Sequence, residues 1–353
     1  MPLVILGAVL LLLMLLQSYG YRKLWDRGLA YRAGFSSKEV FEGDRLFLRE
    51  ELVNNKFLPL PWVFIKFQLP SQFIFVNANA EPLPHNIAGS LYAIMSYTTI
   101  RRRRPFVCQK RGVYNLRSAN VAVSDLLHNQ EYNKDFILHG ELLVFPKPLE
   151  KCEKIDLLFK QLDAAVLSNR LINPDPFEFR GLREYQPTDP LRNVNFKATA
   201  VAQEMMVNIH APTAAQRLVL ALNLEDMDAP AELHEQGIRL CATLGEHYIN
   251  RDAHMGFHTN GRCWTQQQTI RIDKTTHLPI GSGASQLYRL LECLARITPR
   301  VQCPPMAEYI NQLTDTQQVY VFISSYDGAD FREAFNALEE RGIEAFWIVP
   351  FIE

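Results

Sequence analysis

The residues best suited to chemistry by type and spacing lie in one segment, Glu178–Val207, called the signature segment below. Charged and aromatic side chains alternate along it, and the residues singled out are Arg183, Tyr185, Asp189, Arg192 and Phe196. Arginines and carboxylates at this spacing can form bidentate pairs, which orient two groups as well as attract them. Pro187 and Pro190 disfavour a helix interior, so the sequence predicts a rigid turn that carries these charges.

Two roles for the signature segment stay open from the sequence. In the first, its charges form an internal strut at the junction of two domains, with Tyr185 and Phe196 packed beneath the ion pairs. In the second, the same charges form an exposed surface on which a partner docks. The first role makes the pairs matter for stability, and the second makes them matter for association.

Three residues in the last third of the chain have side chains that can bind metals or act as nucleophiles. His254 and His258 are four apart, but the residues between them predict a strand, which separates the two rings by about 13 Å. Cys263 follows closely, and a thiol near an imidazole can act as a nucleophile. A hydrolase that uses Cys263 is therefore the alternative to a non-enzymatic role, although a structural cysteine is the simpler interpretation.

The amino-acid composition limits the classes of protein to which this chain can belong. The chain has 353 residues, with 37 Lys+Arg against 38 Asp+Glu, and this balance argues against general nucleic-acid binding. Its hydrophobic content of 48% is typical of a folded protein with room for two domains. The six cysteines form no C-x-x-C pair, so free thiols in a reducing compartment are expected rather than a disulfide framework.

An uninterrupted apolar run, Leu3–Leu16, predicts a membrane anchor near the N-terminus. Aromatic residues expected at the membrane interface follow it: Tyr19, Tyr21 and Trp25. Basic residues also follow it: Arg22, Lys23 and Arg27. Positive charge after a span predicts a single-pass cell-membrane protein whose soluble domains are cytoplasmic.

The hydrophobic patterning predicts an α+β multidomain fold. Residues 1–21 are the anchor, and 22–150 show the period-two pattern of a β-sandwich, as in Arg45–Val53 and Trp62–Leu69. Residues 151–210 hold a connector helix and the signature turn. Residues 211–353 alternate buried strands, such as Leu218–Leu222 and Val319–Ile323, with amphipathic helices, which predicts an α/β domain with a mostly parallel sheet.

A basic run, Arg101–Arg104, interrupts the β-sandwich region. One interpretation is a solvated strand or hairpin. The other is attraction to anionic lipid headgroups, to which each nearby basic residue contributes on the order of 1 kcal/mol.

The signature segment resembles the defining motif of family 58 among the domains of unknown function. Seven positions fit that motif: Glu178, Phe179, Arg183, Tyr185, Asp189, Arg192 and Ala200. Four positions depart from it: Thr188, Val194, Phe196 and Val201. The resemblance extends to Arg111–Tyr114 and to the Gly281–Ile297 stretch, and so covers most of the chain after the anchor.

The resemblance implies a bacterial membrane protein with a von Willebrand factor A-like α/β domain and a MoxR-type AAA+ ATPase as partner. Such domains often bind Mg²⁺, and the corresponding positions here are Asn223, Glu225, Ser282 and Asp327. Asn223 lacks the usual charge and Met227 cannot ligate a hard cation, so a degenerate site without a cofactor is expected. The predicted function is a membrane-anchored, non-enzymatic protein-interaction module that works with the ATPase to assemble or remodel a complex.

Overall fold

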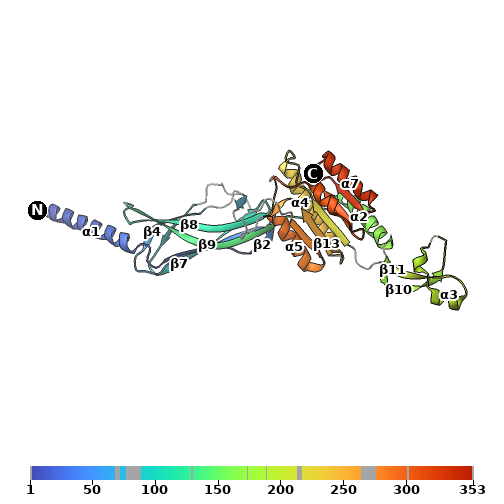
Figure 1. Cartoon of the computed structure of the whole chain (residues 1–353). Coiled ribbons are helices and arrows are strands. Elements are labelled where there is room, and N and C mark those ends of the chain that lie inside the picture. Colours follow the sequence, from blue (N-terminus) through green and yellow to red (C-terminus); the bar gives the residue numbers. More distant parts are fainter. Residues whose placement is uncertain are drawn as a thin grey trace. The chain divides into compact units, whose positions relative to one another are not determined.

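The computed structural model describes residues 2–67, 72–76, 89–128, 130–172, 174–187, 189–212, 217–263, 276–299 and 302–351 (Figure 1). Thr188 of the signature segment lies outside these residues. The chain divides into two compact units, Met1–Lys147 and Pro148–Glu353.

The first unit contains one helix and two β-sheets. Its elements are α1 (Pro2–Leu24), β1 (Leu29–Phe35), β2 (Glu39–Phe41), β3 (Arg45–Asn54), β4 (Leu60–Phe67), β5 (Phe73–Phe75), β6 (Gly89–Ile94), β7 (Thr98–Cys108), β8 (Gly112–Ser124) and β9 (Glu131–Phe145). One sheet has the strand order β1-β3-β7-β5, and the other has the order β2-β9-β8-β4-β6.

Period-two alternation explains how these two sheets share a core. Along β3, Leu46, Leu48, Glu50 and Leu52 are buried, while Phe47 and Arg49 are exposed and Glu51 is half-buried. The three leucines pack in the core. They belong to one apolar cluster with Val121 and Leu142 of the other sheet. The predicted strand at Arg45–Val53 is therefore confirmed as β3, and one face of each sheet covers the other.

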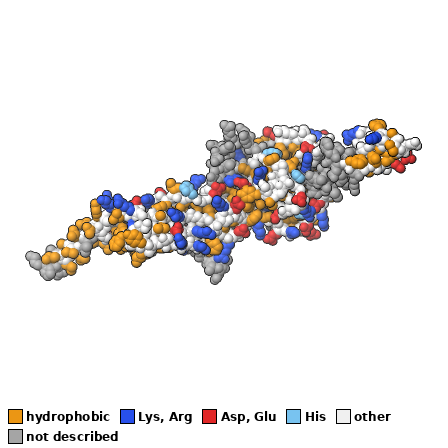
Figure 2. Space-filling view, turned by 90° about the horizontal axis from the view of Figure 1, so that it is seen from below, with side chains coloured by type: hydrophobic (Ala, Val, Ile, Leu, Met, Phe, Trp, Pro, Cys, Tyr) orange, Lys and Arg blue, Asp and Glu red, His pale blue; other side chains and the backbone are white. Residues whose placement is uncertain are grey.

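The helix α1 is long and apolar enough to cross a membrane over Ile5–Leu24. Orange side chains cover it in Figure 2. The helix continues past the predicted apolar run, and its last turns join the first unit: Tyr21 is fully buried and its hydroxyl donates to the carbonyl of Pro59 at 2.7 Å. The expectation that Tyr21 lies at a membrane interface is therefore wrong, whereas Tyr19 is exposed.

A buried charge cluster lies inside the first unit, between β1, β3 and β7. Glu50 points inward from β3, and its Oε1 accepts hydrogen bonds from Arg104 Nη2 and Tyr31 Oη, both at 2.8 Å. Its Oε2 accepts a hydrogen bond from Tyr92 at 3.2 Å. The Arg104 and Glu50 side chains are only 8% and 2% exposed. Arg104 thus supplies the positive charge that neutralises the buried Glu50 carboxylate.

We predict that Arg104→Ala destabilises the first unit by roughly 3–5 kcal/mol, because it leaves the Glu50 carboxylate buried without its cation. Hydrogen exchange of the slowest amides in β3 and β7, measured on the full chain in detergent, reports this free energy. Arg101→Ala is the matched control on the same strand, since its ion pair with Glu51 is exposed. Equal exchange in the two variants would contradict the importance of the buried pair.

The second unit contains the remaining elements. They are α2 (Glu153–Ile172), β10 (Pro174–Glu184), η1 (Leu191–Asn193), α3 (Phe196–Ala202), β11 (Met206–Pro212), β12 (Arg217–Leu222), α4 (Ala231–Ile249), β13 (His254–Thr259), β14 (Arg262–Cys263), β15 (Thr276–Gly281), α5 (Gly283–Arg296), β16 (Ile297–Thr298), α6 (Met306–Gln312), β17 (Val319–Ile323), α7 (Ala329–Glu340) and β18 (Ala345–Ile348).

A mixed five-stranded sheet with the order β15-β13-β12-β17-β18 organises the second unit. Strands β13, β12, β17 and β18 are parallel, and β15 pairs with β13 in the antiparallel sense. The α6 and α7 helices share one apolar cluster with β12 and β17, which includes Met306, Phe322 and Phe331. The predicted alternation of buried strands with helices is confirmed, and the parallel strands bring their carboxyl ends to one edge.

Candidate functional site

Polar side chains gather where three parallel strands end in the second unit. Asn223 follows β12, Asn260 follows β13 and Ser324 follows β17. All three are almost fully buried. Open α/β sheets usually bind ligands at the carboxyl ends of their strands, so this edge is the candidate site of the second unit.

Asn223 is the centre of this group. Its Nδ2 donates to Ser324 Oγ at 3.1 Å, and its Oδ1 accepts from Asn260 Nδ2 at 2.7 Å. The backbone N–H of Glu225 also donates to Asn223 Oδ1, at 3.1 Å. Asn260 in turn accepts from the N–H of Leu224 at 2.9 Å and donates to the carbonyl of Pro304 at 3.0 Å. These polar atoms hold the strand ends to one another.

The four positions expected to form a degenerate Mg²⁺ site do not come together. Glu225 lies beside Asn223, and its Oε2 accepts from the N–H of Met306 at 3.1 Å; burial raises the pKa of this carboxyl. Asp327 follows β17 but pairs with Arg332, which lowers the pKa of Asp327. Within the described ranges, no group of three or more His, Cys, Asp or Glu side chains is arranged to hold a metal ion.

Ser282 lies at the opposite edge of the sheet from Asn223. Strand β15 is antiparallel to β13, so Gly281 pairs with Met255 near the start of β13, whereas Leu222 pairs with Thr259 at its end. Four residues of strand separate the two edges by about 13 Å. The expected grouping of Ser282 with Asn223 is therefore wrong, and Ser282 precedes α5 as its N-cap residue.

Asn260 and Ser324 are the site residues that the sequence interpretation missed. The available signal is that each of these polar residues directly follows a buried parallel strand, as Asn223 does.

The signature segment forms a two-stranded hairpin of β10 and β11, with η1 and α3 between the strands (Figure 1). Arg183 and Asp189 form the bidentate pair that their types allow: Nη1 to Oδ2 at 2.6 Å and Nη2 to Oδ1 at 2.5 Å. Asp189 also accepts from the N–H of Gln186 at 2.9 Å. The Arg183 guanidinium holds the pKa of Asp189 below its usual range. The pair closes the turn of its own hairpin.

The other signature residues differ in their surroundings. Tyr185 is half-buried, and its N–H donates to the carbonyl of Met205 at 2.8 Å. Arg192 is exposed on η1, and Phe196 at the start of α3 is 78% exposed. Phe196 does not pack beneath the ion pair, and this corrects the expectation from the sequence. Phe196 directly follows the N-cap residue Asn195. Its side chain projects to solvent, because the half-buried positions of this short helix are Ala198 and Thr199.

The hairpin exposes an unusual number of large apolar side chains. This apolar hairpin surface consists of Phe179, Leu182, Leu191, Phe196, Val201 and Met205. Orange atoms mark it at the right-hand end of Figure 2. All six lie on the β10–β11 hairpin or on the segment between its two strands.

Cys263 and His258 do not form a nucleophile–base pair. The Cys263 Sγ lies 3.7 Å from the Cys293 Sγ. The His258 ring stacks on Tyr309 with centroids 3.5 Å apart, and neither of its nitrogens has a hydrogen-bond partner in the described part of the chain. Trp264 lies outside the described residues. Burial lowers the pKa of His258 to about 4, so it is a neutral ring at physiological pH.

Comparisons with known proteins give no family. No family model matches the chain, and no curated protein matches it. Among solved structures, it is similar at 12% identity to an alkylpurine DNA glycosylase from Pseudomonas fluorescens, with a TM-score of 0.18, over 33% of this chain and 32% of that one. It is also similar to a cohesin from Archaeoglobus fulgidus (10% identity, TM-score 0.21, 32% and 90% covered) and to a conjugative transposon lipoprotein from Bacteroides eggerthii (15%, 0.20, 32% and 95%). The chain thus spans about a third of the glycosylase, and these likenesses carry no functional argument.

We predict that His258 makes the second unit less stable in acid. Its folded pKa of about 4 lies below the ordinary value of 6.5, so the unfolded chain binds the extra proton between these values. The free energy of unfolding has its full value above pH 6.5, where His258 is neutral in both states. It falls by about 3 kcal/mol as the pH drops to 4. Urea denaturation of the full chain across this range, followed by tryptophan fluorescence, measures the loss. His258→Gln should flatten the profile and the exposed His139→Gln should not; identical profiles for both variants would contradict this assignment.

Proposed function

We propose that this chain is a membrane-anchored, non-enzymatic protein-interaction module whose soluble units lie in the cytoplasm. The apolar helix α1 supports anchoring, and the Arg22, Lys23 and Arg27 cluster that follows supports the orientation. The observation that carries the interaction role is the apolar hairpin surface, which contains Phe196 at 78% and Val201 at 84% exposure. Exposing this area to water is unfavourable unless a partner covers it.

The partner we propose is a MoxR-type AAA+ ATPase that assembles or remodels a complex with this protein. The support is the resemblance of the signature segment to family 58, whose shared residues lie on the same hairpin as the apolar surface. The α/β unit is proposed to be von Willebrand factor A-like, because its sheet has four parallel strands, three of which end in polar residues, and helices α6 and α7 pack on it. That edge has its polar atoms engaged internally, which favours a binding role over a catalytic one.

The alternative function, a hydrolase that uses Cys263 or a divalent metal, has less support. His258 is stacked on Tyr309 and gives the thiol no base, and Asn223 uses its oxygen within the protein. No specific arrangement of the described residues favours this alternative.

We predict that the double change Phe196→Ala and Val201→Ala weakens binding to the ATPase at least about tenfold, since each side chain removed from an apolar interface core costs on the order of 1 kcal/mol or more. The melting temperature should stay near that of the wild type because both side chains are exposed. Biolayer interferometry with the immobilised full chain in nanodiscs measures the affinity.

Phe57→Ala is the matched control for this prediction, because Phe57 is an equally exposed phenylalanine in the first unit. Undiminished binding by the hairpin double variant would contradict the docking role. Asp189→Ala and Arg192→Ala then separate the two roles of the signature charges. A lower melting temperature for Asp189→Ala alone indicates a local strut, and weaker binding by a stably folded Arg192→Ala indicates direct contact with the partner.

A further inference from the structure

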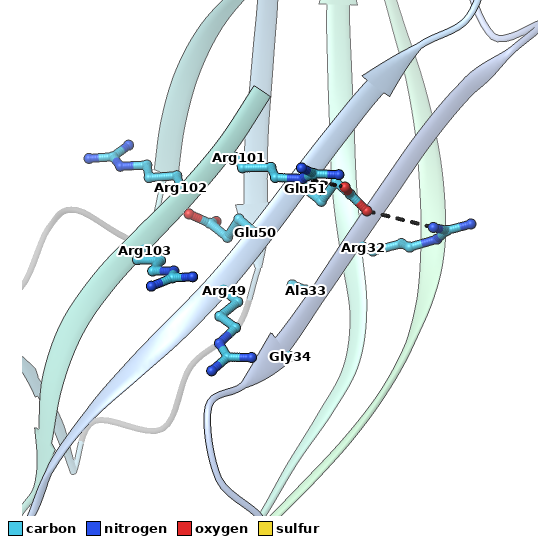
Figure 3. Close-up of a pocket in the computed structure, with 9 residues that line it drawn as sticks. All are labelled: Arg32, Ala33, Gly34, Arg49, Glu50, Glu51, Arg101, Arg102 and Arg103. Atoms are coloured by element: carbon cyan, nitrogen blue, oxygen red, sulfur yellow. Dashed lines mark hydrogen bonds and ion pairs between the residues drawn. The ribbon is translucent and has the colours of Figure 1, made fainter. Parts of the chain in front are cut away.

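A hollow of about 310 Å³ lies in the outward face of the sheet β1-β3-β7 in the first unit (Figure 3). Five arginines line it, together with Gly34 and two glutamates; the arginines are Arg32, Arg49, Arg101, Arg102 and Arg103. A volume of this size is at the lower end of small-molecule binding sites, which run from about 300 to 1,000 Å³.

Strand register places the lining residues in three rows, and two of these rows face outward. Gly34, Arg49 and Arg103 are directly opposite one another across β1, β3 and β7. Two positions along, Arg32, Glu51 and Arg101 form the next row. Period two places these two rows on the outward face. The side chains of the row between them, Ala33, Glu50 and Arg102, belong to the opposite face, where Glu50 meets Arg104.

The two rows differ in how their charges are compensated. Glu51 Oε1 lies 2.8 Å from Arg101 Nε, and its Oε2 lies 3.6 Å from Arg32 Nη1. Arg49 and Arg103 have no carboxylate within 4.0 Å among the residues that the structure describes. Like charges directly opposite on neighbouring strands repel each other. The row of Arg49 and Arg103 therefore carries positive charge that an anion in the hollow would neutralise.

Gly34 is one of the residues that line the hollow. Its backbone is not in the left-handed region, so the conformation does not require glycine there. A Cβ added at this position would meet no atom within 4 Å. The missing side chain thus leaves open the space beside Arg49, and Figure 3 shows the Arg49 and Arg103 side chains extending to this side while Arg102 points away.

We propose that this hollow binds a phosphoryl group, with Arg49 and Arg103 as its two guanidinium ligands. A carboxylate has two oxygens and is satisfied by one guanidinium fork, whereas a phosphate has enough oxygens to accept bidentate bonds from two forks. Glu51 holds Arg32 and Arg101 at the rim of the hollow. This site is independent of the hairpin and of the proposed partner.

A soluble phosphate ester and a lipid headgroup both carry the required phosphoryl chemistry, so the test includes an arm that distinguishes the two sources.

The test uses the full chain in zwitterionic nanodiscs, titrated with inorganic pyrophosphate in a calorimeter. We expect saturable binding of one pyrophosphate per chain. Arg49→Gln and Arg103→Gln should each weaken it at least about tenfold, as expected for loss of a charged hydrogen-bonding group. Gly34→Leu should weaken it comparably while keeping every charge, because the new side chain fills the hollow.

Arg117→Gln is the matched control, since Arg117 is an exposed arginine on β8 in the other sheet. An equal loss with Arg117→Gln, or full binding by Gly34→Leu, would show diffuse attraction and overturn the proposal, as would absence of saturable binding by the wild type. Nanodiscs with phosphatidylglycerol identify the source. Competition that depends on Arg49 supports a headgroup ligand, and unchanged pyrophosphate affinity supports a soluble one.

Discussion

The side chain of Asn223 connects the ends of three neighbouring parallel strands, and the arrangement of the second unit's polar edge depends on it. One amide donates to Ser324 and accepts from Asn260, and all three groups are buried. A neutral amide can do both, whereas a carboxylate could only accept and would place a charge in a site with almost no solvent. An asparagine at this position therefore joins the strand ends without burying a charge.

The first unit separates its charges by the same physical rule. Successive residues of a strand face opposite sides, so Glu50 and Arg104 meet in the core while Arg49 and Arg103 meet at the surface. The inner pair is compensated and hydrogen-bonded, and the outer pair shares no carboxylate in the described part of the chain. In both units the buried polar groups serve the fold, and the two binding surfaces that we propose, the apolar hairpin surface and the hollow beside Gly34, consist of outward-facing residues.

Periodicity made much of this architecture predictable. The buried run at Leu218–Leu222 falls in β12, the run at Val319–Ile323 is β17, and the strand around His254 is β13. Local patterns do not predict features that depend on pairing between residues distant in sequence. The position of Ser282 depends on the antiparallel sense of β15, which cannot be read from its own residues. The burial of Tyr21 depends on β-sheet residues distant in sequence, and the exposure of Phe196 on α3 is likewise not encoded in the local pattern.

The central claim is that α1 anchors two cytoplasmic units that present binding surfaces. Protease protection tests it most directly, with an epitope at the C-terminus of the full chain and protease added to intact spheroplasts. The account predicts that the chain sediments with membranes until detergent is added, and that the epitope survives external protease but is lost after lysis. Digestion of the epitope in intact spheroplasts, or release of the chain without detergent, would contradict the account.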